Sequence, residues 1–327
     1  MRNRRLGRTG LQVSELTFGG GWVGGILIDA DDDTRRECLK RALDAGVNWI
    51  DTAPSYGQGA SETALGWLLK EIPADQRPGL GTKVRLDTSD LSDIAGQVER
   101  SVHDSLKRLD MDRVDLLQLH NPLLAETAPD RIGIDKLLER GGVLDALETV
   151  QAQGLTRFLG FTAVGEAPAC VAAIESGRFD TAQVYYNMIA PTAATGSPPG
   201  WTGPVQDGVL DACRARDLGV LVIRVFAAGV LATDVRHGRE VQIFDAADVS
   251  VEERRAAAVF KVLGDKYGTR AQTALRFALS NTDVSTVIFG LASLDHLDEA
   301  LKAAEMGPLP DEALAELDKL WKADFKV

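Results

Sequence analysis

The amino-acid sequence predicts an α/β fold built on a parallel sheet, closed or open, and two observations carry this prediction. Short apolar runs with the length of buried strands alternate along the chain with stretches of helical periodicity. Strands and helices that alternate one by one are typical of parallel sheets. The 327 residues, 45% of them hydrophobic and 26% charged, are enough to bury a sizeable core.

The expected elements follow in order along the chain. Strands are expected at residues 16–18, 49–51, 80–83, 114–120, 158–161, 181–185, 220–225 and 287–289. Helices are expected at residues 34–45, 62–70, 93–109, 143–153, 167–176, 206–216, 252–267 with 271–280, 294–304 and 311–324. Before the first strand, residues 4–6 and 12–13 flank a glycine-containing turn, which predicts a β-hairpin. Because no linker separates two complete units, residues 1–327 are expected to form a single domain.

Four polar residues stand at or just after the ends of predicted strands. Asp51 ends an apolar run, and Tyr56 follows it in a turn-rich stretch. Lys83 ends a short strand, and His120 ends the clearest buried strand, which Asn121 and the next proline stop. In a barrel of parallel strands the carboxyl ends converge on one mouth, so these side chains are expected to share a pocket there.

The chemistry expected of this set is proton transfer at Tyr56. A free tyrosine has a pKa of about 10, and a nearby ammonium such as that of Lys83 favours the phenolate and lowers this pKa. Asp51 can keep Lys83 charged and oriented, while His120 can donate a hydrogen bond to a carbonyl oxygen. Taken singly, each residue also has an ordinary structural role, such as a cap or a core group. Only their joint order and spacing predict catalysis.

That order and spacing resemble the aldo-keto reductase superfamily, over nearly the whole chain. The similar segments are residues 6–10, 46–57, 61–66, 81–83 and 115–120. The resemblance implies a (β/α)8 TIM barrel whose floor is capped by the N-terminal β-hairpin, with long βα-loops at the C-terminal face. It also implies a nicotinamide cofactor bound in extended form and hydride transfer between this cofactor and a carbonyl, alcohol or sugar hemiacetal carbon.

The resemblance implies particular cofactor contacts, some of them altered in this chain. The expected contacts are Gly20, Gly21, Thr162, Gln183, Arg224, Phe226, Gly290, Ser293, His296 and Glu299. Ala163 stands where relatives have an asparagine that holds the carboxamide, and Ile223 stands where many have a stacking tyrosine. The nicotinamide site is therefore expected to be recognisable but changed.

The segment expected at the adenosine end of the cofactor carries no cation. Residues 290–299 contain no Lys or Arg, whereas relatives that prefer NADPH place one there to pair with the 2′-phosphate. Asp295 and Asp298 would repel a phosphate. NAD is therefore expected to be preferred, with NADP as the alternative.

The branch most similar in appearance contains aldose, galactose and pyridoxal dehydrogenases, which implies oxidation of an aldose-like substrate to a lactone. Three alternatives remain open. One is an NADPH-dependent aldehyde or ketone reductase, and another is a noncatalytic cofactor-binding partner protein. The third is an aldolase that forms a Schiff base on Lys83.

The long loops after strands are expected to cover the site, because such loops build the active face of a barrel. They span residues 121–142, 190–205 and 226–250. Trp22, Asn121 and Trp201 are expected to line the substrate pocket. Trp201 has a second possible role as an anchor that pins its loop to the rim. The glycine-rich stretch 19–25 lacks the spacing of a Rossmann motif.

Composition argues against several other classes. The formal net charge of −12 disfavours a general attraction to nucleic acid or anionic membranes. No segment is apolar enough to span a membrane, and no apolar stretch of the signal-peptide kind follows the basic residues 2–5. Cys38, Cys170 and Cys213 are expected to be reduced, as in a cytoplasmic protein, and no metal-ligand spacing is present.

Overall fold

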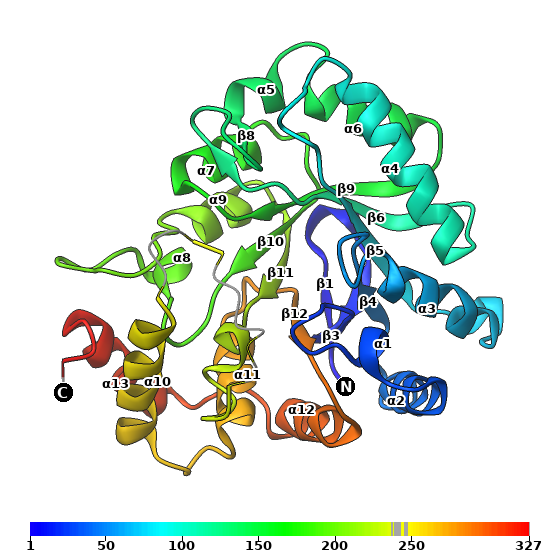
Figure 1. Cartoon of the computed structure of the whole chain (residues 1–327). Coiled ribbons are helices and arrows are strands. Elements are labelled where there is room, and N and C mark those ends of the chain that lie inside the picture. The colour runs from blue at the N-terminus through cyan, green and yellow to red at the C-terminus, as the bar shows by residue number, and fades with distance from the viewer. Residues whose placement is uncertain (237, 239–242, 245–247, 327) are drawn as a thin grey trace.

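The computed structural model describes residues 1–236, 238, 243–244 and 248–326 of the chain. Its centre is a closed barrel of parallel strands with helices around the outside (Figure 1). Each barrel strand pairs with the barrel strand that follows it along the chain, and the last barrel strand pairs with the first. The barrel strands are β3 (Leu16–Gly19), β4 (Trp49–Asp51), β5 (Gly79–Val84), β6 (Val114–Leu119), β9 (Thr156–Ala163), β10 (Thr181–Tyr185), β11 (Gly219–Ile223) and β12 (Thr286–Gly290). The expected (β/α)8 barrel is confirmed.

Helices surround the barrel and α10 also packs against α13 beside it. The longer helices are α2 (Asp32–Asp44), α3 (Ala60–Lys70), α4 (Ile94–Leu109), α6 (Val143–Ala152), α7 (Ala167–Glu175), α9 (Val209–Ala215), α10 (Val249–Leu263), α11 (Arg270–Ser280), α12 (Leu294–Met306) and α13 (Asp311–Lys322). Short helices and strands lie in the loops: α1 (Ile26–Asp29), α5 (Ile134–Leu138), α8 (Thr192–Thr195), β7 (Leu123–Leu124) and β8 (Ile132–Gly133). The sequence did not predict these short elements, because two to five residues are too few to show a period.

Several element boundaries differ from the expected ones for local reasons. Helix α10 begins at Val249, three residues before the expected start at residue 252, because the Asp248 side chain accepts a hydrogen bond from the Ser250 amide and caps it. Strand β11 ends at Ile223, before the expected end at residue 225, since Arg224 has a left-handed φ of 60°.

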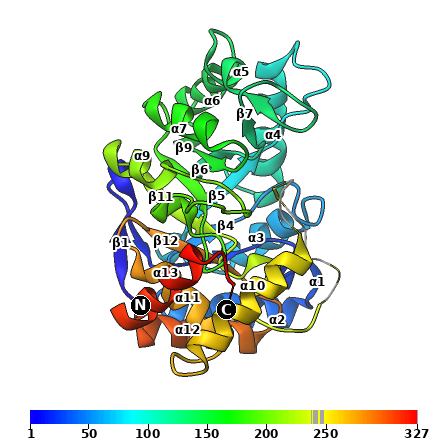
Figure 2. The same ribbon diagram turned by 90° about the vertical axis from the view of Figure 1, so that its left-hand side faces the viewer.

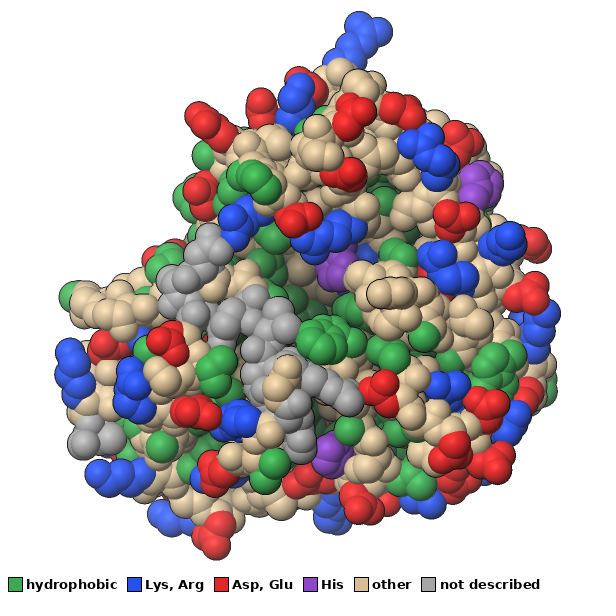
Figure 3. All heavy atoms as spheres, in the orientation of Figure 1, with side chains coloured by type: hydrophobic (Ala, Val, Ile, Leu, Met, Phe, Trp, Pro, Cys, Tyr) green, Lys and Arg blue, Asp and Glu red, His purple; other side chains and the backbone are tan. Residues whose placement is uncertain are grey.

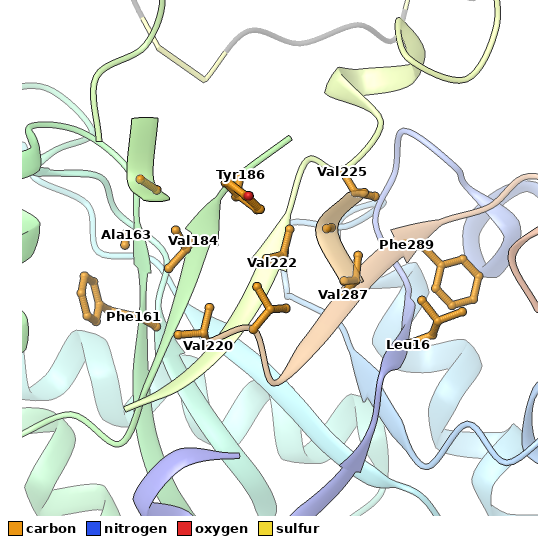
Figure 4. Close-up of a cluster of buried hydrophobic side chains, with 14 of the residues drawn as sticks. Leu16, Phe161, Ala163, Val184, Tyr186, Val220, Val222, Val225, Val287 and Phe289 are labelled. Carbon is orange, nitrogen blue, oxygen red and sulfur yellow. The ribbon is translucent and has the colours of Figure 1, made fainter. Parts of the chain in front are cut away.

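The barrel strands show the alternation that a sheet buried on both faces requires. Successive side chains of a strand point to opposite sides. On the outer side, Leu16, Phe161, Val184, Val222 and Phe289 are fully buried among the hydrophobic side chains shown in Figure 4. The residues between them point into the barrel.

The N-terminal hairpin closes the floor of the barrel, as expected. Strands β1 (Asn3–Arg5) and β2 (Gln12–Ser14) pair antiparallel around a short 3-10 helix. Leu6 and Val13 of this segment form a buried apolar cluster with three inward-facing barrel residues: Trp49, Leu116 and Leu221. Figure 2 shows β1 at one end of the barrel and α1, which follows β3, at the other. The floor is therefore apolar and filled.

Three further expectations concern the loop 226–250, the cysteines and membrane spans. The loop 226–250 includes residues 237, 239–242 and 245–247, which lie outside the described residues. Cys38, Cys170 and Cys213 are buried free thiols, and burial raises the pKa of each to about 12. In the described part of the chain, no helix combines the length and apolar composition needed to cross a bilayer.

Candidate active site

A cavity of about 860 Å³ opens at the carboxyl ends of the barrel strands. Residues on or just after every barrel strand line it: Gly19, Asp51, Arg85, His120, Thr162, Gln183, Ile223 and Gly290. Figure 3 shows the hollow near the centre of this face, with histidine and basic side chains at its edge. This is the face on which (β/α)8 barrels carry their chemistry.

Lys83 is the centre of a buried cluster in the wall of the cavity. Its side chain is fully buried, and its Nζ donates to Asp51 Oδ1 at 2.5 Å, to the Thr52 carbonyl at 2.8 Å and to Tyr56 Oη at 3.2 Å. Three hydrogen bonds use all the donors of an ammonium. The lysine therefore has a fixed position, between the carboxylate of Asp51 and the phenol of Tyr56.

Asp51 is held from its other oxygen by two amides. Gln118 Nε2 donates to Asp51 Oδ2 at 3.0 Å, and Gln183 Nε2 donates to the same oxygen at 2.6 Å. All three side chains are buried. A buried carboxylate is tolerated when it is paired and hydrogen-bonded, and here three donors fix its orientation.

His120 completes the set that the sequence predicts. Its ring lies edge-on to that of Tyr56, with centroids 6.0 Å apart and an interplanar angle of 83°. Its Nδ1 is buried and has no hydrogen-bond partner among the described residues. Burial, then the charges of Lys83 and Arg85, hold the pKa of His120 well below its ordinary value. The imidazole is therefore neutral near pH 7, with one N–H as a donor.

The charge balance at Tyr56 differs from the expected one. Burial raises the pKa of Tyr56 above its ordinary value, and this effect outweighs the attraction of Lys83, which lowers the pKa. The expectation that Lys83 brings the pKa of Tyr56 below 10 is therefore wrong for the protein alone. Desolvation disfavours the phenolate more strongly than one shared ammonium favours it.

Lys83 itself remains a cation. Burial lowers its pKa, but the adjacent Asp51 carboxylate and the Tyr56 hydroxyl raise it, and the net result is a pKa above the ordinary value. A charged ammonium is not a nucleophile. This geometry disfavours the Schiff-base aldolase alternative.

Most of the expected cofactor contacts line the cavity. They are Gly21, Thr162, Gln183, Arg224, Phe226, Gly290, His296 and Glu299. Thr162 Oγ1 is buried without a hydrogen-bond partner among the described residues, which leaves it available to a ligand amide. A Cβ on Gly21 would come within 3.8 Å of the Tyr56 ring, so the bare backbone keeps that space open. These residues fit a nicotinamide cofactor.

Gly20 and Ser293 do not line the cavity. The Gly20 amide donates to the Asp51 carbonyl at 2.8 Å, and a Cβ there would lie 2.5 Å from Ser61 Oγ. Ser293 caps α12, where its hydroxyl accepts from the His296 amide at 3.3 Å. Both residues shape the wall from behind rather than facing the cavity.

Of the three expected substrate-pocket residues, only Trp22 lines the cavity. Asn121 is buried and ties two loops together, since its amide bonds both backbone polar groups of Leu86. Trp201 packs against Arg255 and Phe325 and donates to the Pro204 carbonyl at 3.1 Å. The expectation for Asn121 and Trp201 is therefore corrected, and the alternative role of Trp201 as a loop anchor fits the structure.

The sequence analysis missed two inward-facing residues of the site. Gln118 lies two positions before His120, and Arg85 lies two positions after Lys83. Because side chains two apart share a face of a strand, this spacing could have identified both. Asp130 and Arg131 also line the cavity, from the loop after β6, and no periodicity points to them.

A closed parallel barrel with a buried Lys–Asp–Tyr cluster and a histidine at its mouth belongs to the class of (β/α)8 proteins with an enzyme-like site. Residues 15–322 match the Aldo/keto reductase family, and the chain belongs to this family of oxidoreductases.

Similar proteins of known name agree with this assignment. L-galactose dehydrogenase of Arabidopsis thaliana is 24% identical, over 97% of this chain and 93% of its own length. D-threo-aldose 1-dehydrogenase of a Pseudomonas species is 29% identical, over 68% and 69%. The holo form of aldo-keto reductase AKR11C1 from Bacillus halodurans superimposes with a TM-score of 0.75 at 23% identity, covering 98% of this chain and 96% of that one. That structure supports the fold alone.

Proposed function

We propose that this protein is an NAD-linked dehydrogenase that oxidises the hemiacetal carbon of an aldose-like sugar to a lactone. The observation that carries the proposal is the buried Lys83 ammonium, which donates to Asp51 and Tyr56 in the wall of the cavity. When bound, a nicotinamide cofactor supplies the hydride acceptor. Two named relatives are aldose-type dehydrogenases, which supports the substrate class.

The side chains of the cluster divide the work of proton transfer. Tyr56 accepts the proton of the hydroxyl on the reacting carbon as that carbon loses its hydride. Lys83 stabilises the phenolate form of Tyr56 through its hydrogen bond at 3.2 Å, and Asp51 holds Lys83 in position. His120, which is neutral, donates to the substrate oxygen and keeps it oriented toward Tyr56.

Preference for NAD rests on the end of the cavity formed by β12 and α12. Of the described lining residues there, His296 and Glu299 are polar, and none is Lys or Arg. The two aspartates that the sequence suggested lie elsewhere: Asp295 is not among the lining residues, and Asp298 pairs with Arg41 at 3.2 Å. Glu299 is the acid that faces the cavity, and it would oppose a 2′-phosphate.

The raised pKa of Tyr56 favours a second function, reduction of a carbonyl. A phenol that stays protonated near neutrality is ready to act as a general acid. In the oxidation direction, kcat/KM should therefore rise with pH through and beyond pH 10, since it reports the free enzyme. In the reduction direction, kcat/KM should stay flat at pH values below the raised pKa of Tyr56 and should fall only where Tyr56 loses its proton.

The experiment that tests these proposals is a panel of aldoses, pyridoxal and simple aldehydes, assayed with NAD and NADP in both directions. We expect oxidation of an aldose with NAD, at a kcat/KM at least about tenfold above that with NADP. A large advantage for NADP would overturn the cofactor assignment. Binding of nucleotide without turnover of any substrate would instead indicate a noncatalytic partner protein.

A further inference from the structure

A tight turn on the loop after β6 reaches the edge of the cavity. Ala128 and Arg131 exchange backbone hydrogen bonds at 3.2 and 2.9 Å, with Pro129 and Asp130 between them. Asp130 has a φ of 62°, a left-handed conformation that usually takes glycine or asparagine. Aspartate is one of the few residues besides glycine that adopt this conformation, so the backbone alone does not mark a site.

The turn is fastened to the neighbouring loop after β5. The Asp130 amide donates to Thr88 Oγ1 at 2.8 Å, and Asn121 Nδ2 donates to the carbonyls of Leu86 and Asp130 at 3.0 and 3.3 Å. These bonds fix the Asp130 backbone. Because the backbone is fixed, the carboxylate has a defined place at the cavity edge.

Asp130 stands beside Arg85, which lines the same cavity. Arg85 Nη2 and Asp130 Oδ1 are 3.6 Å apart, beyond the range of a good hydrogen bond. Their side chains are 41% and 78% exposed, and an exposed ion pair contributes little to stability. The ion pair therefore contributes little to the stability of the fold.

The pair has the chemistry to bind neighbouring hydroxyls. A guanidinium offers only donors and a carboxylate only acceptors, whereas a hydroxyl is both. Of two adjacent hydroxyls, one can accept a hydrogen bond from Arg85 and the other can donate one to Asp130. The diol thereby links the two side chains. Trp22, which is 39% exposed and lines the same cavity, offers a flat apolar face to the C–H side of a sugar ring.

We propose that Arg85 and Asp130 recognise a vicinal diol of an uncharged sugar, on carbons beyond the one that reacts. This inference rests on the proposed function and names the part of the substrate that sets specificity. The local charges of the pair cancel, and Asp130 would oppose an anionic group. This pair is therefore matched to the hydroxyls of a neutral aldose; Arg131 and Arg224, which also line the cavity, are not part of it.

The test compares Asp130→Asn and Arg85→Gln with Asp110→Asn as the matched control. Asn tolerates the left-handed conformation, so Asp130→Asn removes charge and keeps the turn. Asp110 is also left-handed, with a φ of 52°, and pairs with Lys70 away from the cavity. Each variant is assayed for oxidation of the best aldose and for reduction of butanal, which has no hydroxyl.

Both site variants should lower kcat/KM for the aldose by about 10- to 100-fold, mainly through KM, because each loses a charge-assisted hydrogen bond. In Asp130→Asn, butanal reduction should change less than about twofold, and Asp110→Asn should change neither reaction. A deoxy-aldose that lacks one of the bound hydroxyls should bind the wild type more weakly, and the substitutions should cost it less affinity than they cost the parent aldose. Equal losses on aldose and butanal in Asp130→Asn would overturn the inference.

Two further results separate this inference from the proposed function. A wild-type preference of more than about tenfold for a hexuronate over the matching neutral hexose would overturn the inference but leave the dehydrogenase assignment intact. If the wild type turns over no aldose with either nucleotide, the proposed function fails. Calorimetric titration of the aldose into nucleotide-loaded protein then decides the inference: weaker binding by Asp130→Asn supports it, and absent or unchanged binding overturns it.

Discussion

The same strands build the floor and the mouth of the barrel, and on each strand the floor residue and the mouth residue are two positions apart. On β4 the inward-facing Trp49 belongs to the apolar floor and Asp51 to the site, and on β6 Leu116 and Gln118 stand in the same relation. Two residues advance a strand by roughly 6–7 Å. Over that step the interior changes from packed hydrocarbon to a hydrogen-bonded ionic cluster. The comparison teaches that stability and chemistry occupy separate layers of one barrel.

The largest effect should come from the mouth. Tyr56→Phe removes the group that exchanges the proton, so kcat should fall by about 10²- to 10⁴-fold. Nucleotide affinity should stay nearly unchanged, because the ring and its packing remain, whereas the free energy of unfolding should fall by about 1 kcal/mol, because the buried Lys83 ammonium loses one hydrogen bond. Steady-state kinetics and nucleotide titration measure the two halves of this prediction. Retention of more than a tenth of the activity would show that Tyr56 is not the proton-transfer group.

A change in the floor should reverse that pattern. Leu6→Ala leaves a cavity in the apolar cluster and should lower the free energy of unfolding by about 2–5 kcal/mol. At a temperature where the variant is folded, kcat should stay within about threefold of the wild type. Denaturant unfolding and kinetics on the same samples test this, with the exposed Met306→Ala as control. A large loss of kcat in the folded variant would break the separation of layers.

Gln118→Leu sharpens the comparison at the boundary between the layers. Asp51 Oδ2 would keep its bond from Gln183 but lose the one from Gln118. We expect kcat to fall about tenfold and stability to fall by about 1 kcal/mol, since one hydrogen bond to a buried carboxylate is removed. An unchanged kcat together with a lower stability would assign Gln118 to the structural layer.

The smallest effect concerns pH and stability. The depressed pKa of His120 means that the folded protein disfavours its protonated form. Its contribution to stability is therefore complete above about pH 6.5 and declines as the pH falls below that value, where the unfolded chain takes up a proton. His120→Gln should flatten the loss of stability between about pH 6.5 and pH 5, measured by denaturant unfolding. An identical slope in both proteins would contradict the buried, neutral imidazole.

Much of this architecture could be read from the sequence because the signals were local. The barrel follows from strands and helices in strict alternation. Asp51 and His120 each follow an apolar run, and Lys83 stands at the end of a predicted short strand. Tyr56 was found by its spacing within a long motif. The convergence of these residues needed no information beyond strand order.

The rest depended on distances between segments, which no local pattern carries. The exposure of Tyr56 decides the direction of its pKa shift, and the sequence does not contain that exposure. Asn121 turns toward Leu86 rather than the cavity, and Trp201 finds Arg255, because of loop conformations set by packing. Gln118 is the exception, since its spacing of two residues from His120 places both side chains on the same face of β6.

The hairpin under the barrel also has a consequence for the order of folding. The Arg4 guanidinium donates to three carbonyls at the end of α11 and in the turn that leads to β12: Leu279, Asn281 and Val284. These partners lie about 280 positions further along the chain. Long separations make such contacts slow to form. The hydrogen bonds of Arg4 are therefore expected to form late in folding, after the barrel strands between residues 4 and 279 have paired.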